Sequence, residues 1–566
     1  MVKIKLGRSA VREVKEGTPI SKLIPAGQPI IAAKLEGELV GLNTPLTKDA
    51  KIEFVLATDS EGLRIHQESL IFVLTMAAKR AFPDARLVVE HSTSKGFYCT
   101  LRMERIMEKR DVELLEAEML GLLADDLPVT MREVDRKEVT AICKRNNNTS
   151  KLALLEYADK DEYIIHRCGD FADWARGPLV PSTGSLCAFE LLHYPPGFIL
   201  RYPTPESFPE LPHFVEQPKL FLIFHHYERW SEALGISDIG QLNRLVREDK
   251  GLELVNVAEA LHEKAIARIA DRIAATTLLP RIVLIAGPSS AGKTTFSKRL
   301  AVHLRVNGLR PQPLSVDDYF FDRSSTPLDE EEKPDFEGID AIDLEFFNQQ
   351  LVLLLEGKRV DRPRFDFERG RRCFDGTTMI LEPNEILIVE GIHALNPRLT
   401  SAVPKHLKFK IYVSALTQLN YHDQRIVSTS DTRMLRRMLR DYSYRAHTPT
   451  RTMKRWAKVR RGEERNVFPY QESADEMFNS ALIYELAVMR NKAMKLLRTV
   501  RGKGLRSEAE RIISLLELVT PMDDAAVPPA SILREFIGSS IFRTRNTPNT
   551  RNTRNTPGTT KKKRTN

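Results

Sequence analysis

The chain has 566 residues, of which 42% are hydrophobic and 28% are charged. This length exceeds one ordinary hydrophobic core and predicts about three or four domains. No apolar run approaches the roughly 20 residues of a membrane helix, and the N-terminal MVKIKLG lacks the segments of a secretory signal. We therefore expect a cytoplasmic protein with no membrane partner.

Cysteine usage argues against a disulfide-rich or zinc-binding protein, and the charge distribution argues against a uniformly basic surface. The cysteines are scattered without a CxxC or Cys/His cluster, which argues against a disulfide framework or a zinc site and predicts buried or half-buried thiols. They are Cys99, Cys143, Cys168, Cys187 and Cys373. The formal charge is +9, but residues 542–566 hold eight Lys/Arg and no acid, so the remainder carries about +1. A basic surface over the whole folded part is not expected.

The sequence of the first half of the chain predicts a small mixed sheet, an α+β unit and a helical connector. Residues 1–58 contain short alternating segments and one helical turn at PISKLI, which suit a small mixed sheet. Residues 59–228 predict an α+β unit, with the helix pattern SLIFVLTMAAKRAF and a Gly/Pro-rich loop at 176–184. Residues 229–278 are charged and helical, and we interpret them as a connector.

The second half predicts a parallel α/β unit. The apolar strand RIVLIAG ends at Gly287, and strands alternate with helices over residues 279–500. Residues 501–541 predict a helical extension. Residues 542–566 repeat Arg, Asn, Thr and Pro without apolar residues, so we expect a disordered basic tail; contact of this tail with RNA stays open.

A phosphate-binding loop is the most specific motif. GPSSAGKT, from Gly287 to Thr294, satisfies GxxxxGK[ST] between an apolar strand and a helix-like segment. Backbone amides and the helix N-terminus can then face phosphates, Lys293 can reach the terminal phosphates, and Thr294 can hold magnesium. The predicted ATP-binding residues are Gly287, Pro288, Ser289, Ser290, Ala291, Gly292, Lys293, Thr294 and Thr295.

Carboxylates follow the next two apolar strands. Asp317 and Asp318 follow PQPLSV, and either carboxylate could accept the proton of an attacking hydroxyl. Glu390 ends EILIVE and is placed to hold a magnesium-bound water. A single acid after a strand often caps a helix, but several such strand ends in one unit favour a nucleotide site.

An arginine-rich helix follows in DTRMLRRMLRDYSYR. Arg433 and Arg437 are four residues apart, and Arg437 and Arg440 are three apart, so the three cations share one helix face. In isolation this pattern is typical of a solvated basic helix. Beside a phosphate loop, these arginines could close over the transferred group and neutralise its charge.

Residues 280–480 resemble the uridine kinase and phosphoribulokinase family through GPSSAGKTT, LSVDDYFFD, DFEGIDAID, RPRFDFERGRR, ILIVEGIHAL and RRMLRDYSYR. The resemblance implies a P-loop kinase that uses ATP and Mg²⁺. It implies that Asp317 is the general base and that Arg437, Arg440 and Arg445 contact the ATP phosphates.

The acceptor-binding motifs differ from those of the pyrimidine nucleoside kinases. Glu337 stands where those kinases have Asp, Phe365 where they have Tyr, and Gly370 where they have the His that reads the pyrimidine, whereas Arg372 matches. The resemblance implies a nucleoside acceptor, uridine or cytidine first, through Glu337, Phe365 and Arg372. A non-nucleoside sugar or a sugar phosphate is the alternative.

Residues 1–225 resemble the N-terminal region of threonyl-tRNA synthetases through EGLRIHQESLIFVLTMAAKRAFPDARL, SKGFYCTL and GDFADWARGPLVPSTG. This implies a β-grasp TGS domain followed by an editing-like domain. Where the synthetases have an HxxxH pair, a Cys and a His, this chain has Glu68, Phe72, Ala175 and Leu179, so we expect no editing hydrolysis.

The role of the N-terminal half stays open between two readings. It could bind tRNA, as part of a nucleotide-gated RNA-binding regulator or an RNA-regulated kinase, or it could be a scaffold for stability or for a homo-oligomer. We expect the nearby His66 to face solvent.

Overall fold

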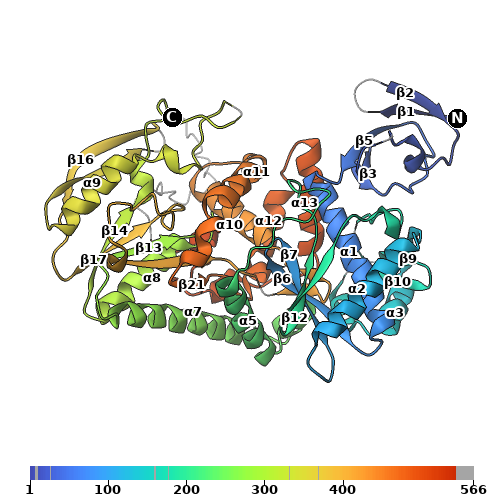
Figure 1. The fold of residues 1–566 in the computed structure, drawn as a ribbon, viewed down its shortest axis with the longest axis horizontal. Coiled ribbons are helices and arrows are strands. Elements are labelled where there is room, and N and C mark those ends of the chain that lie inside the picture. Colours follow the sequence, from blue (N-terminus) through green and yellow to red (C-terminus); the bar gives the residue numbers. More distant parts are fainter. Residues whose placement is uncertain are drawn as a thin grey trace, which may run out of the picture.

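The computed structural model describes residues 1–542 apart from residues 7–9, 26, 159–160, 176, 331, 367–368 and 418. The predicted disordered tail therefore lies outside the described residues from position 543 onward. In Figure 1 the N-terminal units lie on the right, the α/β unit lies on the left, and helices α10, α12 and α13 lie between them.

The first unit is a five-stranded mixed sheet in the order β2-β1-β5-β3-β4. Strands β1 and β5 are parallel, and the other neighbours are antiparallel. The alternation of apolar and charged residues orients β1 in the sheet, because Val2 and Ile4 are buried whereas Lys3 and Lys5 are exposed. The strands are β1 (Val2–Leu6), β2 (Ala10–Val14), β3 (Ile30–Leu35), β4 (Glu38–Val40) and β5 (Ala50–Leu56). This is the predicted β-grasp fold.

The second unit packs helices on two antiparallel sheets, in the orders β11-β12-β7-β6 and β10-β9-β8. Its long helix α1 (Ser60–Ala81) buries Leu70, Leu74 and Ala77 on one face. The other helices are α2 (Lys109–Ala124), α3 (Arg136–Arg145) and α4 (Thr149–Tyr157). The strands are β6 (Arg86–Thr93), β7 (Gly96–Arg102), β8 (Val129–Asp135), β9 (Glu162–Cys168), β10 (Phe171–Trp174), β11 (Glu190–Tyr194) and β12 (Gly197–Arg201).

Three helices connect this unit to the α/β unit: α5 (Pro218–Ala233), α6 (Ile239–Arg247) and α7 (Gly251–Ala274). Helix α7 runs along the edge of the α/β unit (Figure 1). Helix α5 spans residue 228, where a domain boundary was expected. The division at residues 58, 228, 278, 500 and 541 stays a prediction.

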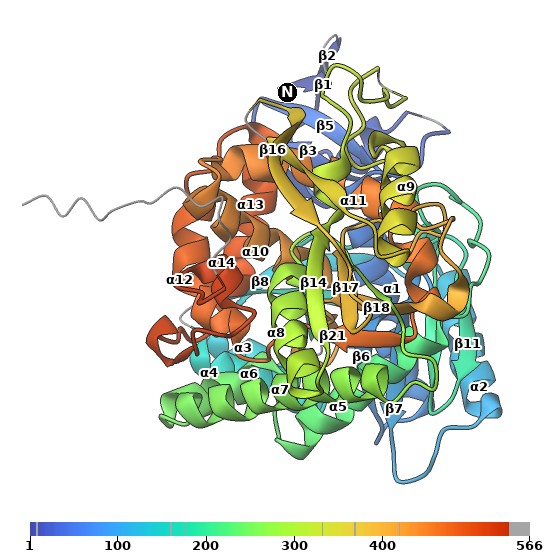
Figure 2. The ribbon, with the colours of Figure 1, turned by 90° about the vertical axis from the view of Figure 1, so that its left-hand side faces the viewer.

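The α/β unit is built on a parallel sheet in the order β14-β17-β13-β18-β21. Figure 2 shows these strands running beside α8. The strands are β13 (Ile282–Ala286), β14 (Arg310–Ser315), β17 (Glu385–Glu390), β18 (Lys408–Ser414) and β21 (Glu476–Asn479). Two hairpins are added, β15 (Val360–Asp366) with β16 (Arg371–Met379) and β19 (Asn420–His422) with β20 (Arg425–Ile426). The helices are α8 (Lys293–Val306), α9 (Leu344–Leu355), α10 (Thr429–Tyr444), α11 (Pro449–Asn466), α12 (Glu485–Leu497), α13 (Lys503–Leu516) and α14 (Arg534–Ile537).

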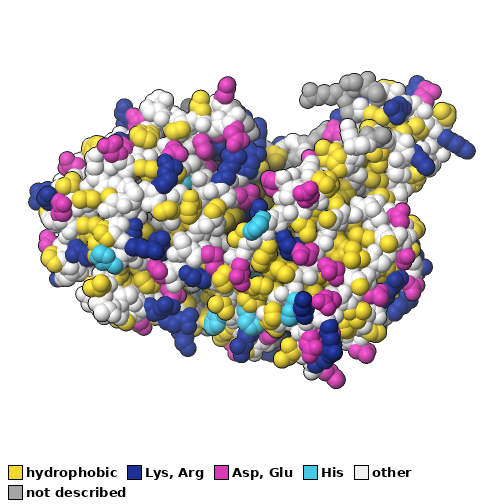
Figure 3. Space-filling model, in the orientation of Figure 1, with side chains coloured by type: hydrophobic (Ala, Val, Ile, Leu, Met, Phe, Trp, Pro, Cys, Tyr) yellow, Lys and Arg dark blue, Asp and Glu magenta, His cyan; other side chains and the backbone are white. Residues whose placement is uncertain are grey.

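Three features of the described residues bear on the expectations from composition. Within the described part of the chain, no helix is long and apolar enough to cross a bilayer. Basic and acidic side chains are intermingled on the face in Figure 3, and no broad basic patch covers it. The expected burial of the thiols holds for four cysteines but is wrong for Cys373, which is exposed because its hairpin strand β16 has few protein neighbours.

Candidate active site

The backbone of the phosphate loop is fixed by two glycines. A Cβ at Gly287 would lie 1.9 Å from the carbonyl oxygen of Val413 on β18, so this close approach requires glycine. Gly292 is the N-cap of α8 with a φ of 84°, a conformation that favours glycine. These constraints turn the loop into the N-terminus of α8, where backbone amides can face an anion.

The lysine and threonine of the loop contact different groups. Lys293 Nζ donates hydrogen bonds to the carbonyl oxygens of Gly287 and Pro288, at 2.9 and 3.1 Å. Thr294 Oγ1 donates to Glu390 Oε1 at 2.8 Å. Burial raises the pKa of Glu390 to about 7, against the attraction of Lys293 and the hydrogen bond from Thr294. The loop threonine and the strand-end carboxylate therefore meet, as a shared metal site would require.

The two adjacent aspartates lie in different environments. Both are in the 3₁₀ turn Val316–Tyr319 after β14. Asp317 is open to solvent but enclosed by protein on most sides; this enclosure raises the pKa of Asp317, and the cations Lys293, Arg445 and Arg440 oppose the rise. Asp318 instead accepts a hydrogen bond from the backbone amide of Phe365 at 3.2 Å. Of the two carboxylates, Asp317 is the one on which the charge of the loop residue Lys293 acts.

Helix α10 holds the phosphate loop through two buried arginines. Arg433 pairs with Glu463 at 2.5 Å and donates to the carbonyl oxygen of Ser289 at 3.0 Å. Arg436 pairs with Glu485 at 2.6 Å and donates to the carbonyl oxygen of Ser480, which follows β21, at 2.8 Å. The alternative of a solvated basic helix therefore does not hold for Arg433, because Glu463 and the loop cover it.

Arg437, Arg440 and Arg445 are less buried than Arg433 and Arg436. Arg437 donates to Ser289 Oγ at 2.6 Å. Arg440 and Arg445 lie 3.2 and 3.6 Å from the carboxylate of the buried Asp441. Repulsion by Arg440 and burial lower the pKa of Arg445 to about 10. Mutual repulsion among these cations would be relieved by a bound anion.

Two carboxylates that sequence reasoning missed also bind the loop. Glu463 Oε1 on α11 accepts a hydrogen bond from the amide of Ser289 at 2.8 Å. Glu535 Oε2 on α14 accepts from the amide and the hydroxyl of Thr295, at 3.2 and 2.8 Å. Both acids occur in charged segments, RRGEERN and LREFIG, that are typical of helix surfaces, so no local pattern indicated their roles.

Glu337 and Phe365 lie near the predicted base. Burial raises the pKa of Glu337, and the nearby cations Arg437 and Arg455 oppose that effect. Phe365 is buried and packs edge-on against Phe320, with ring centroids 5.8 Å apart. Because the amide of Phe365 binds Asp318, the hairpin strand β15 is fixed beside the aspartate turn.

Arg372 and Gly370 define the other side of this hairpin. Arg372 Nη2 donates to Asp343 Oδ2 at 2.9 Å, and the guanidinium lies 4.9 Å from the ring centroid of Phe346. Its Nη1 is buried and has no hydrogen-bond partner among the described residues. A Cβ at Gly370 would lie 2.3 Å from Cδ of Arg323, so the Arg323 side chain fills the space that a residue other than glycine would occupy.

Three of the four editing-site positions of the N-terminal half are filled by apolar side chains or bridged by an ion pair. Phe72 is buried and packs on Phe171 with ring centroids 5.3 Å apart, and Leu179 is buried in the same core. Glu68 forms an ion pair with Arg425 on β20 at 3.2 Å, and Ala175 borders a small cavity that Arg425 also lines. Across the residues that are described, no group of three His, Cys, Asp or Glu side chains could hold a metal ion.

The expected exposure of His66 is wrong. His66 is buried, and its Nδ1 lies 3.9 Å from Cys187 Sγ. The Gly/Pro-rich loop covers this face of α1, because the amide of Val180 donates to Ser69 Oγ at 3.0 Å.

The buried histidines of this half predict acid sensitivity. Burial lowers the pKa of His66 and of His166 to about 4. Because unfolded imidazoles titrate near 6.5, the unfolded chain binds more protons below that pH, and stability is lost as the pH falls from about 6.5 towards 4. The loss is at most about 1.4 kcal/mol per pH unit for each imidazole. Thermal unfolding followed by circular dichroism should give lower midpoints in this window, and the drop should be smaller in the double variant His66→Gln with His166→Gln. Equal drops would contradict the assignment.

Comparison with known proteins agrees with this geometry. Residues 282–483 match the model of the Phosphoribulokinase / Uridine kinase family. The α/β unit is thus similar to the P-loop kinase domain of that family, and we name it the kinase domain. The N-terminal region of the chain matches threonine–tRNA ligases. That of Symbiobacterium thermophilum is 32% identical over 198 residues, which cover 34% of this chain and 30% of the ligase. Threonine–tRNA ligase 1 of Bacillus subtilis is 32% identical, with 34% and 31% covered. The chain thus spans less than a third of the length of these ligases.

Two solved structures are similar to part of the chain. One is a putative fructose transport system kinase from Silicibacter sp. TM1040, with 18% identity, a TM-score of 0.27, and coverage of 38% of this chain and 98% of that one. The other is a possible uridine kinase from Bacillus stearothermophilus, with 17% identity, a TM-score of 0.27 and the same coverage.

Proposed function

We propose that this protein is an ATP-dependent phosphotransferase that transfers the γ-phosphoryl group of ATP to a hydroxyl of a small acceptor. A nucleoside, uridine or cytidine first, is the proposed acceptor. One observation carries the proposal. Asp317 is open to solvent beside Lys293, while the carboxylate of Asp318 next to it is engaged by the backbone.

The phosphates of ATP would bind at residues 287–295. Lys293, Arg437, Arg440 and Arg445 would balance their negative charge. Thr294 Oγ1 and Glu390 fit a magnesium site, since this ion prefers oxygen ligands and these two oxygens lie 2.8 Å apart. When bound, Mg²⁺ would supply neutralisation of the charge on the transferring phosphate.

Asp317 would accept the proton of the acceptor hydroxyl as that oxygen bonds to the γ-phosphorus. The bond from the γ-phosphorus to the bridging oxygen breaks, and ADP leaves with the electron pair. Such proton transfer requires the ionised carboxylate, which Lys293, Arg440 and Arg445 favour. Glu337, Phe365 and Arg372 would hold the acceptor. Nη1 of Arg372 supports this role, because it is a buried donor without a hydrogen-bond partner among the described residues, and an acceptor oxygen would supply one.

A sugar or a sugar phosphate is the second candidate acceptor. Arg323 occupies the space next to Gly370, where pyrimidine nucleoside kinases have a base-reading His. A cation there would suit a phosphorylated acceptor. For either acceptor, we propose that the N-terminal half is a scaffold or an RNA-binding regulator of the kinase.

ADP release by the full chain with MgATP tests this proposal. The panel contains uridine, cytidine, other nucleosides, sugars and sugar phosphates. We expect acceptor-dependent release that is fastest with a nucleoside. Turnover with only a sugar phosphate would replace the nucleoside by the second candidate, and no turnover with any acceptor would overturn the kinase proposal.

Filter binding to tRNA tests the alternative of a nucleotide-gated RNA-binding protein. Phosphate contacts predict an affinity that falls steeply with salt. ATP-dependent tRNA binding without turnover would favour that alternative, and absence of binding would remove it.

A further inference from the structure

Helix α1 of the editing-like region makes two ion pairs with residues beyond the N-terminal half. Glu68 pairs with Arg425 on β20 at 3.2 Å. Arg64 pairs with Glu508 on α13 at 2.9 Å. Arg64 and Glu68 are four residues apart and therefore share one face of α1. Both partners lie in or next to the kinase domain.

The first link belongs to a hairpin that the kinase domain inserts into the N-terminal half. The backbone of Val89 on β6 bonds with this hairpin twice, by donating to Asp423 O at 2.7 Å and by accepting from Asn420 Nδ2 at 2.8 Å. Arg86 Nε donates to Asp423 Oδ2 at 2.6 Å, and Gln424 accepts from Asn148 at 2.8 Å. The hairpin is thus part of the kinase sequence but is held by the synthetase-like fold.

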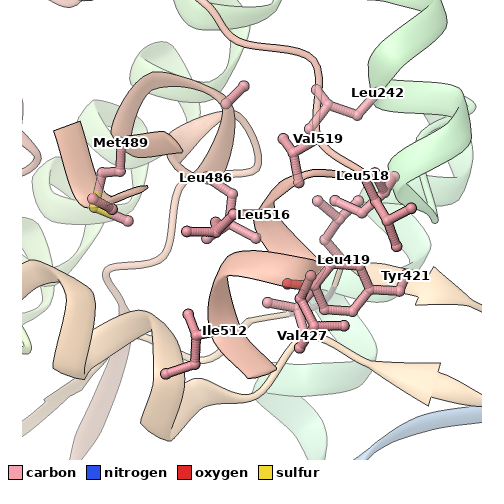
Figure 4. Packing of buried hydrophobic residues seen from close by; sticks show 14 of the residues in the cluster. Leu242, Leu419, Tyr421, Val427, Leu486, Met489, Ile512, Leu516, Leu518 and Val519 are labelled. Atoms are coloured by element: carbon pink, nitrogen blue, oxygen red, sulfur yellow. The ribbon is translucent and has the colours of Figure 1, made fainter. Parts of the chain in front are cut away.

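Apolar packing reinforces this attachment. Leu419, Tyr421 and Val427 are buried in one continuous core. Figure 4 shows them beside Leu516, the last residue of α13, and beside Leu518 and Val519, which follow that helix. The same core contains Trp174 of β10 and Met438 of α10, so it spans both halves.

The second link ends at the first turn of α10. Glu508, which binds Arg64, also binds Arg511 at 2.8 Å, and Arg511 binds Asp431 at 2.9 Å. Arg511 and Asp431 are less than a quarter exposed, so solvent screens this network less than a surface pair. Because the hairpin ends at Ile426 and α10 begins at Thr429, both links act on the same short segment.

Helix α10 transmits this attachment to the phosphate loop. It is a continuous helix that bears Arg433, Arg436 and Arg437, and these contact Ser289 and Ser290 of the loop. A shift of its N-terminal turn would move all three guanidinium groups relative to the loop. Displacements of about 1 Å at such groups are large enough to change transfer rates.

We propose that Arg64 and Glu68 are positioning residues for α10, through which the synthetase-like half sets the geometry of the arginines at the phosphate loop. The effect on turnover rests on the proposed kinase function. The effect on the helix does not, and the two are measured separately.

Charge reversal of the Glu68–Arg425 pair tests the proposal in the full chain. Arg425→Glu places like charges together, and we expect amide hydrogen exchange in residues 429–445 to become about five- to tenfold faster. Exchange in α8 should change less. The double variant Glu68→Arg with Arg425→Glu should restore slow exchange, because the pair is re-formed with opposite polarity. In kinase assays we expect kcat to fall about tenfold with a smaller change in the KM for ATP, and the double variant to recover it.

The control is the exposed pair of Lys109 and Glu113 on α2, whose side chains are 77% and 62% exposed. Lys109→Glu should leave both readouts unchanged. If Arg425→Glu does not fold, Arg64→Gln cuts only the second link and should also speed exchange in residues 429–445. Unchanged exchange in α10, or failure of the double variant to restore it, would overturn the proposal. Absence of turnover in every variant and in the wild type would count against the kinase function. The exchange result alone would then decide whether Arg64 and Glu68 position α10.

Discussion

Replacing Asp317 by asparagine should lower acceptor phosphorylation by about 10²- to 10⁴-fold, the usual contribution of a general base. The amide has nearly the shape of the carboxylate but cannot accept the proton of the acceptor hydroxyl. Binding of MgATP should change little, since residues 287–295 supply the phosphate contacts. Single-turnover assays of phosphoryl transfer and calorimetric titration with MgATP separate the two effects.

The neighbouring acid provides a matched control. Asp318→Asn changes the same functional group one residue away, but this side chain binds the backbone amide of Phe365 rather than facing the loop lysine. We expect a loss well below that of Asp317→Asn. Lys293→Ala should impair both nucleotide binding and transfer. Equal losses in the two aspartate variants would indicate that the aspartate turn acts as a structural unit, and full activity of Asp317→Asn would exclude it as the base.

Local sequence predicted much of this site because the phosphate loop is a local structure. GxxxxGK[ST] contains its own geometric requirements, as Gly287 and Gly292 show. The acids after β14 and β17 were predicted from the rule that strand ends gather at one edge of a parallel sheet. Thr294 and Glu390 are 96 residues apart in sequence yet bonded, as that rule requires.

The contacts that hold the loop from outside could not be predicted in the same way. Glu463 and Glu535 look like surface acids, and only the packing of α11 and α14 brings them to Ser289 and Thr295. The exposure expected for His66 was wrong for a related reason, since helical periodicity does not reveal which loop covers a face. The docking of the β19–β20 hairpin likewise depends on side chains more than 300 residues apart, such as Arg86 and Asp423, which are separated by 337 positions.

Breaking the buried pair of Arg433 and Glu463 should be costly. The two side chains are only 1% and 3% exposed. Glu463→Ala leaves the guanidinium of Arg433 buried without its counter-charge, and we expect a loss of about 3–5 kcal/mol in the free energy of unfolding of the kinase domain. Urea unfolding can be followed by tryptophan fluorescence, to which Trp456 contributes beside Trp174 and Trp230; the Trp456 ring lies 5.4 Å from the Arg433 guanidinium.

The adjacent Glu464 supplies the control for this prediction. Glu464 pairs with Arg460 at 3.0 Å, but its side chain is 52% exposed, so Glu464→Ala should cost less than about 1 kcal/mol. Replacing both Arg433 and Glu463 by methionine removes both charges and should recover most of the stability lost in Glu463→Ala. The nucleotide affinity lost in Glu463→Ala should not recover in the double variant, because this variant still lacks the hydrogen bonds to the amide and carbonyl of Ser289. Recovery of both would mean that the pair only fills space. Recovery of stability alone would separate its contribution to folding from its role in shaping the phosphate loop.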